Sequence, residues 1–123
     1  MFRQVFSVLS LLFGSLVPVM ASAEDAKGYI VGTVTIQNKD WIAEYRPKTA
    51  ELLEKHGGKI LVRGAPVETL EGKAPEANAI LVVEFPSVES ALAWYNDPEY
   101  APLRDLRQTG STVDWVLVEA LNK

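Results

Sequence analysis

Four segments of the sequence are rich in β-branched or apolar residues and are bounded by residues that favour turns, which is typical of β-strands. These segments are residues 28–36, 59–64, 78–85 and 112–121. One helical segment lies between the first two strands and another between the last two, so the order of elements is β-α-β-β-α-β. This order predicts the α+β class and a ferredoxin-like fold, in which both helices cover one face of a four-stranded antiparallel sheet.

The first helical segment carries an apolar stripe with helical spacing. The stripe consists of Ile42, Tyr45, Thr49, Leu52, Leu53 and His56. Asn38 precedes the helix and is expected to cap it. Pro47 removes one internal hydrogen bond, so we expect a kink or a new start close to it. Gly57 and Gly58 are expected to end the helix, one of them in the left-handed conformation.

The second helical segment begins after Ser87, which is expected to cap it. Further along, the sequence Asp97-Pro98-Glu99 predicts a break, because proline disfavours helical geometry in the residue before it. The same three residues are a start signal, with Asp97 as the cap of a new short helix over residues 98–108.

The stretch around this break, residues 93–107, concentrates aromatic and basic side chains. The favoured interpretation is structural, because aromatic stripes usually pack and exposed ion pairs contribute little. The packing residues are Trp94, Tyr95, Tyr100, Leu103 and Leu106. Arg104 and Arg107 are then expected to pair with nearby acids, which are Asp97, Glu99 and Asp105. The alternative is a ligand-binding surface; its candidates are Trp94, Tyr95, Tyr100, Arg104, Arg107 and the loop residue Glu71, whose default role is a solvated charge.

The third predicted strand is apolar on both faces. Ile80 and Val82 point to one face, while Leu81, Val83 and Phe85 point to the other. Two helices cover only one face of the sheet, and a large exposed apolar surface is rare on soluble monomers. The simplest cover for the second face is the same face of another copy, so we predict a homodimer, sheet against sheet, that encloses a small barrel-like interior.

The N-terminus, residues 1–23, has the pattern of a secretory signal peptide, with a basic start, an apolar core over 5–19 and an Ala-Ser-Ala triplet ending at Ala23. The alternative is an uncleaved membrane anchor. The apolar run is shorter than the roughly 20 residues that a spanning helix needs, and Pro18 interrupts it. We therefore predict cleavage after Ala23, one mature domain over residues 24–123, and a periplasmic or secreted location.

Composition excludes several kinds of partner and site. One of the 12 basic residues, Arg3, lies in the predicted signal, so 11 remain against 16 acidic residues, a net charge of −5. Nucleic acid is therefore not an expected partner, because phosphate binding requires a basic surface. The sequence has no cysteine, which rules out disulfides, thiolate nucleophiles and cysteine-ligated metals.

The chain resembles the small proteins catalogued as domain of unknown function thirteen-thirty over nearly all of residues 27–121. The resemblance rests on an ordered set of short motifs: Tyr-Ile-Val at 29–31, Gly57-Gly58, Arg63-Gly64, Glu71-Gly72, Glu84-Phe85-Pro86, Trp94-Tyr95, Pro98-Glu99-Tyr100 and Leu106-Arg107. It implies a dimeric α/β-barrel, ferredoxin-like fold and no established activity. The sequence departs from the usual pattern at Asp97, where a serine is common, and in its export signal, which many relatives lack.

Arg63 and Glu84 are the first candidates for chemistry. They lie on strands that are expected to be antiparallel neighbours, and they face each other if the connecting loop is centred near Gly72 and Lys73. The favoured interpretation is a cross-strand ion pair. The functional alternative is a half-buried pair in the barrel cavity, where Arg63 holds a carboxylate or phosphate ligand and Glu84 acts as a base or orients its partner.

His56, the only histidine, completes the catalytic candidates. At the end of the first helix its protonated form is stabilised by the helix dipole, which is the favoured role. A general base or an axial haem ligand is the alternative. No other histidine or cysteine supports a metal site, so we predict neither a metal nor a cofactor.

Two classes of function remain open. The first is a binding or structural module whose interior or helix-face cleft holds a small organic molecule. The second is a cofactor-free isomerase or monooxygenase-like enzyme that acts on a small organic substrate in the barrel cavity. This second class rests on analogy with the stress-response barrel, muconolactone isomerase-like and antibiotic-monooxygenase-like dimers, and a fold does not determine a function.

Overall fold

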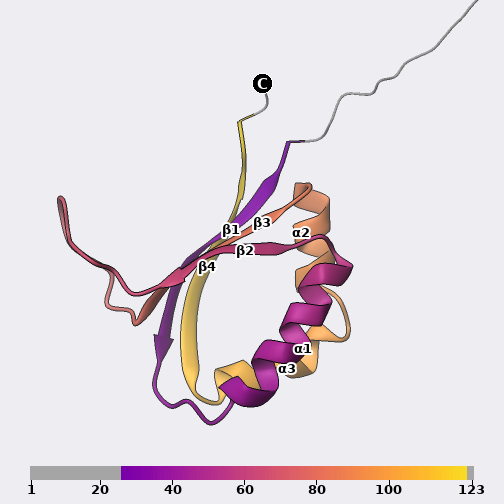
Figure 1. Ribbon diagram of the computed structural model, residues 1–123, viewed down its shortest axis with the longest axis horizontal. Helices are drawn as coiled ribbons and strands as arrows, with labels where there is room; N and C mark the ends of the chain where they lie inside the picture. The colour runs from indigo at the N-terminus through magenta and orange to yellow at the C-terminus, as the bar shows by residue number, and fades with distance from the viewer. Residues whose placement is uncertain (1–25, 122–123) are drawn as a thin grey trace, which may run out of the picture.

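The computed structural model describes residues 26–121, which form one sheet and three helices (Figure 1). The strands are β1 (Gly28–Ile36), β2 (Lys59–Gly64), β3 (Ala79–Phe85) and β4 (Ser111–Glu119). The helices are α1 (Ile42–Lys55), α2 (Val88–Tyr95) and α3 (Tyr100–Gln108). The predicted signal peptide, residues 1–23, lies outside the described residues. Within residues 26–121, no helix combines the length and the apolar character that a membrane crossing requires.

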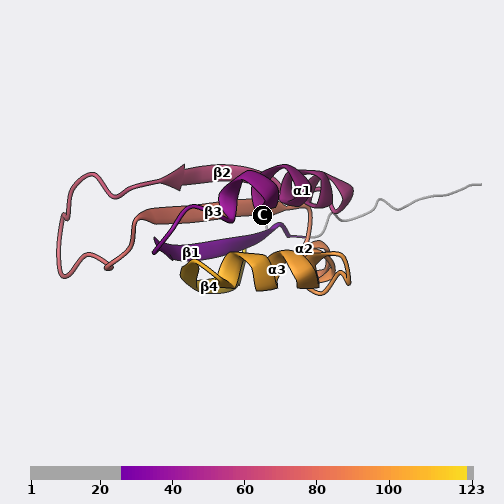
Figure 2. The same ribbon diagram turned by 90° about the horizontal axis from the view of Figure 1, so that it is seen from below.

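The sheet has the strand order β2-β3-β1-β4, and every neighbouring pair is antiparallel. The central strands are therefore β1 and β3, as predicted. All three helices lie on one face of the sheet, with α1 on the β2 and β3 side and α3 on the β4 side (Figure 2). The predicted ferredoxin-like fold is confirmed, with its second helical segment divided into α2 and α3.

The core lies between the helices and this covered face. Its buried residues are Ile30, Leu52, Leu53, Val83, Phe85, Ala91, Trp94, Tyr100 and Leu103. The ring centroid of Trp94 lies 5.9 Å from that of Phe85 and 4.3 Å from that of Tyr100. Residues of the stretch 93–107 thus pack the joint between α2 and α3, as the structural interpretation predicts.

The observed ends of α1 agree only in part with those predicted from the sequence. Gly57 adopts the predicted left-handed conformation, with φ of 77°, directly after the helix. Asn38 does not cap α1, because the helix starts at Ile42; its Oδ1 instead accepts a hydrogen bond of 3.1 Å from the backbone N–H of Asp40 in the preceding turn. A new start at Pro47 is not found either. Pro47 lies on an exposed part of α1, where solvent can satisfy the carbonyl that loses its partner.

The caps of the later helices are better predicted. Ser87 accepts a hydrogen bond of 3.0 Å from the backbone N–H of Ser90, as expected of a cap. Asp97 accepts one of 2.9 Å from the N–H of Glu99, which orders the restart. The regular helix then begins at Tyr100, two residues after the predicted start at Pro98.

Candidate functional site

A cavity of about 410 Å³ lies between α1 and the covered face of the sheet, and we call it the interior cavity. Its deeper lining is buried and includes Leu53, Val83 and Trp94. Exposed side chains form its rim, among them Arg46 and Arg63. The cavity therefore joins the protein core to solvent at the side of the sheet that carries β2.

Aromatic rings form much of the lining. They belong to Trp41, Tyr45, Trp94 and Trp115. The Tyr45 hydroxyl lies 2.7 Å from the hydroxyl of Tyr100. Burial raises the pKa of Tyr45 well above its ordinary value, and Tyr100 raises the pKa further. Tyr45 consequently stays a neutral phenol at physiological pH and can take part in hydrogen bonds, but it does not supply a charge.

Four buried polar atoms have no hydrogen-bond partner within the part of the chain that the structure describes. They are Thr49 Oγ1, Trp94 Nε1, Arg107 Nε and Trp115 Nε1. All four of these residues line the interior cavity. Buried polar groups are nearly always hydrogen-bonded in native proteins, so this cavity concentrates hydrogen-bonding positions that the protein groups around it do not fill.

Arg107 is the most unusual of the four, because its side chain carries a charge and the residue is only 2% exposed. Its guanidinium carbon lies 4.7 Å from the ring centroid of Trp115. None of the ion pairs formed among residues 26–121 includes Arg107. A cation–π contact is worth up to about 2 kcal/mol, less than the several kcal/mol that burial of an ion costs.

The predicted ion pairs of the two arginines on α3 are thus wrong. Arg104 stacks on the rings of Tyr95 and Tyr100, at 4.8 Å and 5.5 Å. Asp97 is instead bound from α1, by Lys55 and His56. Both of these partners lie at the C-terminal end of α1, so the Asp97 carboxylate is engaged there and not by the arginines that follow it.

The predicted pairing of Arg63 with Glu84 is also wrong. Glu84 lies opposite Lys59 on β2, and Arg63 lies opposite Leu81. An irregularity between Ile60 and Val62 shifts the register of the two strands, which sequence alone does not reveal. Because residues 81 and 84 point to opposite faces of β3, Arg63 reaches the interior cavity while Glu84 lies on the uncovered face.

On that uncovered face, Glu84 accepts a hydrogen bond of 2.7 Å from the Tyr29 hydroxyl. The other candidate acid, Glu71, lies in the long connection between β2 and β3, which projects away from the body of the molecule (Figure 1). Glu71 is exposed and does not line the interior cavity of the described chain. The structure therefore brings neither acid to Arg63.

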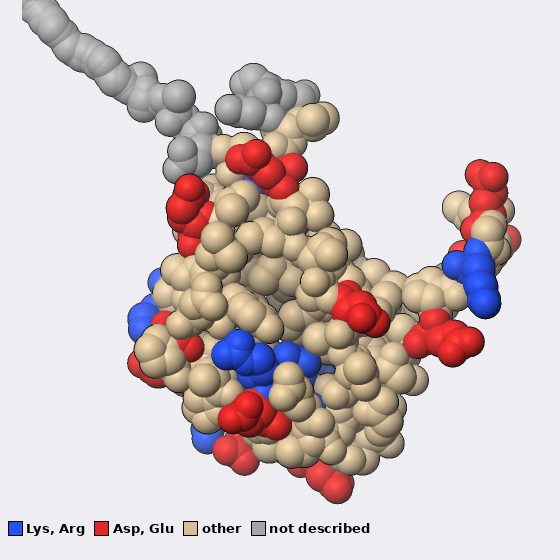
Figure 3. All heavy atoms as spheres, turned by 180° about the vertical axis from the view of Figure 1, so that it is seen from behind, with Lys and Arg blue, Asp and Glu red and all other residues tan. Residues whose placement is uncertain are grey.

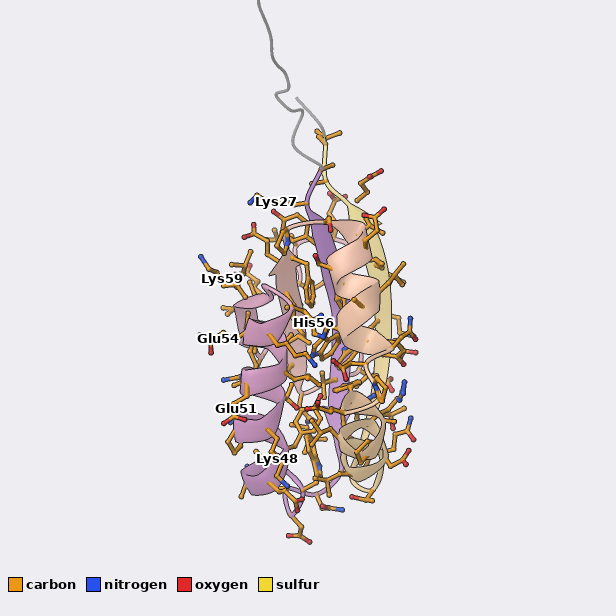
Figure 4. All side chains as sticks on the ribbon, turned by 90° about the vertical axis from the view of Figure 1, so that its right-hand side faces the viewer. Lys27, Lys48, Glu51, Glu54, His56 and Lys59 are labelled. Atoms are coloured by element: carbon orange, nitrogen blue, oxygen red, sulfur yellow. The ribbon has the colours of Figure 1, made fainter. Side chains whose placement is uncertain are left out.

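His56 follows the last turn of α1 and points toward the α2–α3 joint, whereas Glu54 and Lys59 point away into solvent (Figure 4). Its Nε2 lies 2.8 Å from Asp97 Oδ2. Lys55 Nζ donates to the same oxygen at 3.1 Å. This cluster ties α1 to the start of α3, and none of its members lines the interior cavity. The favoured structural role of His56 at the helix end agrees with this placement.

The Asp97 cluster gives a test of stability against pH. His56 and the N–H of Glu99 lower the pKa of Asp97 from 3.8 to about 2. A lowered pKa stabilises the fold fully above the unfolded value, and this contribution is lost as the pH falls toward 2. We expect Asp97→Asn to lower the Tm by a steady amount above pH 4, and by a shrinking amount between pH 4 and pH 2. Asp105→Asn, at an exposed position outside these ion pairs, serves as the control.

In differential scanning calorimetry, a Tm difference between Asp97→Asn and the parent that persists unchanged down to pH 2 would contradict this assignment.

A second cavity, of about 280 Å³, lies between α2 and β4. Its lining is apolar and aromatic, and it includes the candidate Tyr95 and one side of Trp115. Figure 3 shows this face of the molecule, hollowed at its centre with basic side chains at one edge of the hollow. Tyr100, another candidate, is completely buried in the core.

Sequence reasoning missed several residues of the interior cavity as ligand contacts. They are Trp41, Tyr45, Arg46, Thr49 and Trp115. Tyr45 and Thr49 belong to the predicted apolar stripe of α1, so their burial is expected. The stripe does not indicate that they line the interior cavity. Trp115 alternates with Val113 and Leu117, which indicates an inward face. Across residues 26–121, no group of three or more histidine, aspartate or glutamate side chains is arranged to hold a metal ion.

A family model described as "Domain of unknown function (DUF1330)" matches residues 27–121 of the chain. No curated protein matches the chain significantly. Among solved structures, the RPA0582 protein of unknown function from Rhodopseudomonas palustris has a TM-score of 0.67 at 19% identity, over 84% of this chain and 88% of that one.

Two more distant structures share the fold. SnoaB, a cofactor-independent oxygenase from Streptomyces nogalater, has a TM-score of 0.53 at 14% identity, over 80% of this chain and 96% of its own. A protein of unknown function from Bacteroides thetaiotaomicron, described as a possible oxidoreductase, has a TM-score of 0.53 at 13% identity, over 78% and 99% of the two chains. At these identities the similarity shows a common fold and nothing about activity.

Proposed function

The chain belongs to the domain of unknown function (DUF1330) family, and because that description assigns no activity, we propose a function from the cavity itself. The protein is an exported homodimer that binds a small organic molecule in the interior cavity. The observation that carries this proposal is the convergence of four unpaired polar atoms on one cavity. A volume of about 410 Å³ lies within the range of roughly 300–1,000 Å³ that is common for small-molecule sites.

The dimer is supported by the uncovered face of the sheet. The strand registers place one valine from each strand in a row across this face: Val62, Val82, Val31 and Val116. Val116 is 62% exposed and Val62 is 44% exposed. A continuous apolar row on an otherwise uncovered sheet is a self-complementary surface, which suits a two-fold symmetric dimer.

Val116→Asp tests the dimer. A charge in the row, at its β4 end, is expected to convert the dimer to a monomer in light scattering at micromolar concentration, because the charge would be buried without a partner. Val67→Asp is the matched control, since it makes the same replacement at a position outside the row that is 99% exposed in the connection between β2 and β3. A monomeric parent protein, or a Val116→Asp protein that remains fully dimeric, contradicts the proposed interface.

Native mass spectrometry of the protein purified from the periplasm without dialysis tests binding and export together. We expect a dimer of chains that begin at Glu24, with added mass from a retained small molecule. An unprocessed chain contradicts export. Repeated spectra without added mass, together with no shift of Tm by any member of a library of charged and neutral small organic molecules, contradict the binding function.

A second candidate function is a cofactor-free oxygenase. The fold shared with SnoaB, together with a cationic cavity that would stabilise an anionic substrate, favours it. The described lining of the interior cavity contains no carboxylate and no histidine, so a general base to form that anion is missing from it. For this reason binding is the primary proposal. If the purified protein consumes oxygen in the presence of an aromatic substrate, as measured with an oxygen electrode, the oxygenase becomes the primary proposal.

A further inference from the structure

Arg107 places a buried positive charge against the interior cavity. The residue is 2% exposed, its Nε has no hydrogen-bond partner, and no carboxylate of residues 26–121 forms an ion pair with it. Contact with the Trp115 ring at 4.7 Å covers one face of the guanidinium and does not supply a hydrogen-bond partner for Nε. A guanidinium keeps its proton under physiological conditions, so this site requires an anion or water as its partner.

The charge of the whole cavity favours an anion. Its described lining includes three arginines, Arg46, Arg63 and Arg107, and no aspartate or glutamate. The chain as a whole is acidic, with a net charge of −4. The larger groove between α1 and α3 shows the contrast, because its lining mixes lysines with Glu44, Glu51, Glu99 and Asp105. The interior cavity is thus locally electropositive in a negative protein, which attracts anions and orients them.

The remaining donors favour a ligand that accepts hydrogen bonds. The indole N–H groups of Trp94 and Trp115 are buried without partners, and an indole N–H can only donate. A carboxylate offers two oxygens that only accept, and a guanidinium can bind it through two parallel hydrogen bonds. A phosphate carries more charge than one buried arginine balances, because Arg46 and Arg63 lie at the exposed rim.

The aromatic lining of the interior cavity indicates what the uncharged part of the ligand is. Trp41, Tyr45, Trp94 and Trp115 surround the space with flat π surfaces, which favour stacking or edge contacts with another planar ring. We propose that the interior cavity binds a planar aromatic carboxylate, with its carboxylate on Arg107 and its ring among the tryptophans. This inference rests on the proposed binding function and names the class of its ligand.

Three probes test it by isothermal titration calorimetry: 2-naphthoate, the uncharged analogue 2-naphthylmethanol, and 2-naphthyl phosphate. We expect the parent protein to bind 2-naphthoate more tightly than either of the other two. Arg107→Met is expected to weaken the binding of 2-naphthoate by about tenfold to a hundredfold, because a charged hydrogen-bonded pair is lost, and to leave 2-naphthylmethanol unaffected. Arg104→Met, which removes the other arginine of α3, is expected to change neither affinity.

The stability of the ligand-free variant separates a binding role from a structural one. Methionine fills the space of the aliphatic part of the arginine side chain and removes an unpaired charge, so Arg107→Met is expected to keep or raise the Tm. If this variant loses its fold, Arg107 also supports the folded state, and the titration needs a milder replacement. Arg107→Lys then provides the folded variant for titration, and an affinity for 2-naphthoate equal to that of the parent with either variant overturns the assignment of Arg107.

The probe results also separate this inference from the binding function. Equal affinity for 2-naphthoate and 2-naphthylmethanol overturns the anionic class but leaves a small-molecule site. Tighter binding of 2-naphthyl phosphate overturns the carboxylate assignment. Binding of none of the probes, while native mass spectra still show retained mass, overturns the ligand class alone; the absence of both overturns the binding function as well.

Discussion

Replacing Gly32 with alanine is expected to destabilise the protein by about 3 kcal/mol or more. Gly32 lies in the central strand β1 opposite Trp115 on β4. A methyl group at this position would collide with the backbone carbonyl oxygen of Asp114 and would lie 2.7 Å from Trp115 Cδ1. Backbone atoms cannot move aside as a flexible side chain can, so the β1–β4 pairing must distort. In thermal denaturation we expect the Tm to fall by about 10 °C or more.

Gly64→Ala is the matched control for this substitution. Gly64 also lies in a strand, its φ is not positive, and no atom lies within 4 Å of the position where a methyl group would be added. Its replacement is expected to change stability by no more than about 1 kcal/mol, in the stabilising direction, because alanine restricts the unfolded chain. Equal Tm values for Gly32→Ala and Gly64→Ala would show that β1 and β4 are not packed as closely as described.

Phe85→Ala is expected to lower the free energy of unfolding by about 3–5 kcal/mol, as measured by urea denaturation. Phe85 has no exposed surface and packs against Trp94, with 5.9 Å between the ring centroids. Its removal opens a void at the end of β3, where the close approach of Gly58 leaves little room for collapse. Leu92→Ala, at a position that is 47% exposed, should cost less than about 1 kcal/mol. A loss below about 1 kcal/mol for Phe85→Ala would contradict the described core.

The sequence predicts the sheet well because its strands carry local signals. β-branched runs bounded by turn residues set the limits of β1 and β2, and the division of the second helical segment follows from Pro98. Strand order follows from the ferredoxin-like topology, which allows few alternatives. The limits of these strands and the break before α3 depend on residues close together in the chain, so they need no knowledge of distant contacts.

The pairing of Arg63 could not be predicted, because the register between β2 and β3 depends on an irregularity and on a long connection. A shift of three residues separates the expected partner, Glu84, from the observed one, Leu81. That shift also changes the face of the sheet, since side chains alternate along a strand. Contacts between distant segments also decide whether a carboxylate lies near Arg107. The sequence therefore did not indicate that Arg107 forms no ion pair within the described residues.

Arg107 was nevertheless among the candidates, through the aromatic and basic character of residues 93–107. Its residue type was visible in the sequence, but its lack of a counter-ion was not. On α3, the nearby Asp105 lies only two positions away and so projects from a different side of the helix. The unpaired charge becomes evident only when β4 brings Trp115 over the guanidinium.

The most direct test of the binding site is a ¹H–¹⁵N NMR titration that follows the indole N–H signals of the three tryptophans. The indole of Trp41 already donates a hydrogen bond of 2.8 Å to the carbonyl oxygen of Asn38, whereas those of Trp94 and Trp115 have no partner in the described chain. With 2-naphthoate, we predict large shifts for Trp94 and Trp115 and a smaller shift for Trp41. Three unchanged signals at a saturating concentration, or a change confined to Trp41, would contradict a ligand site at these unpaired donors.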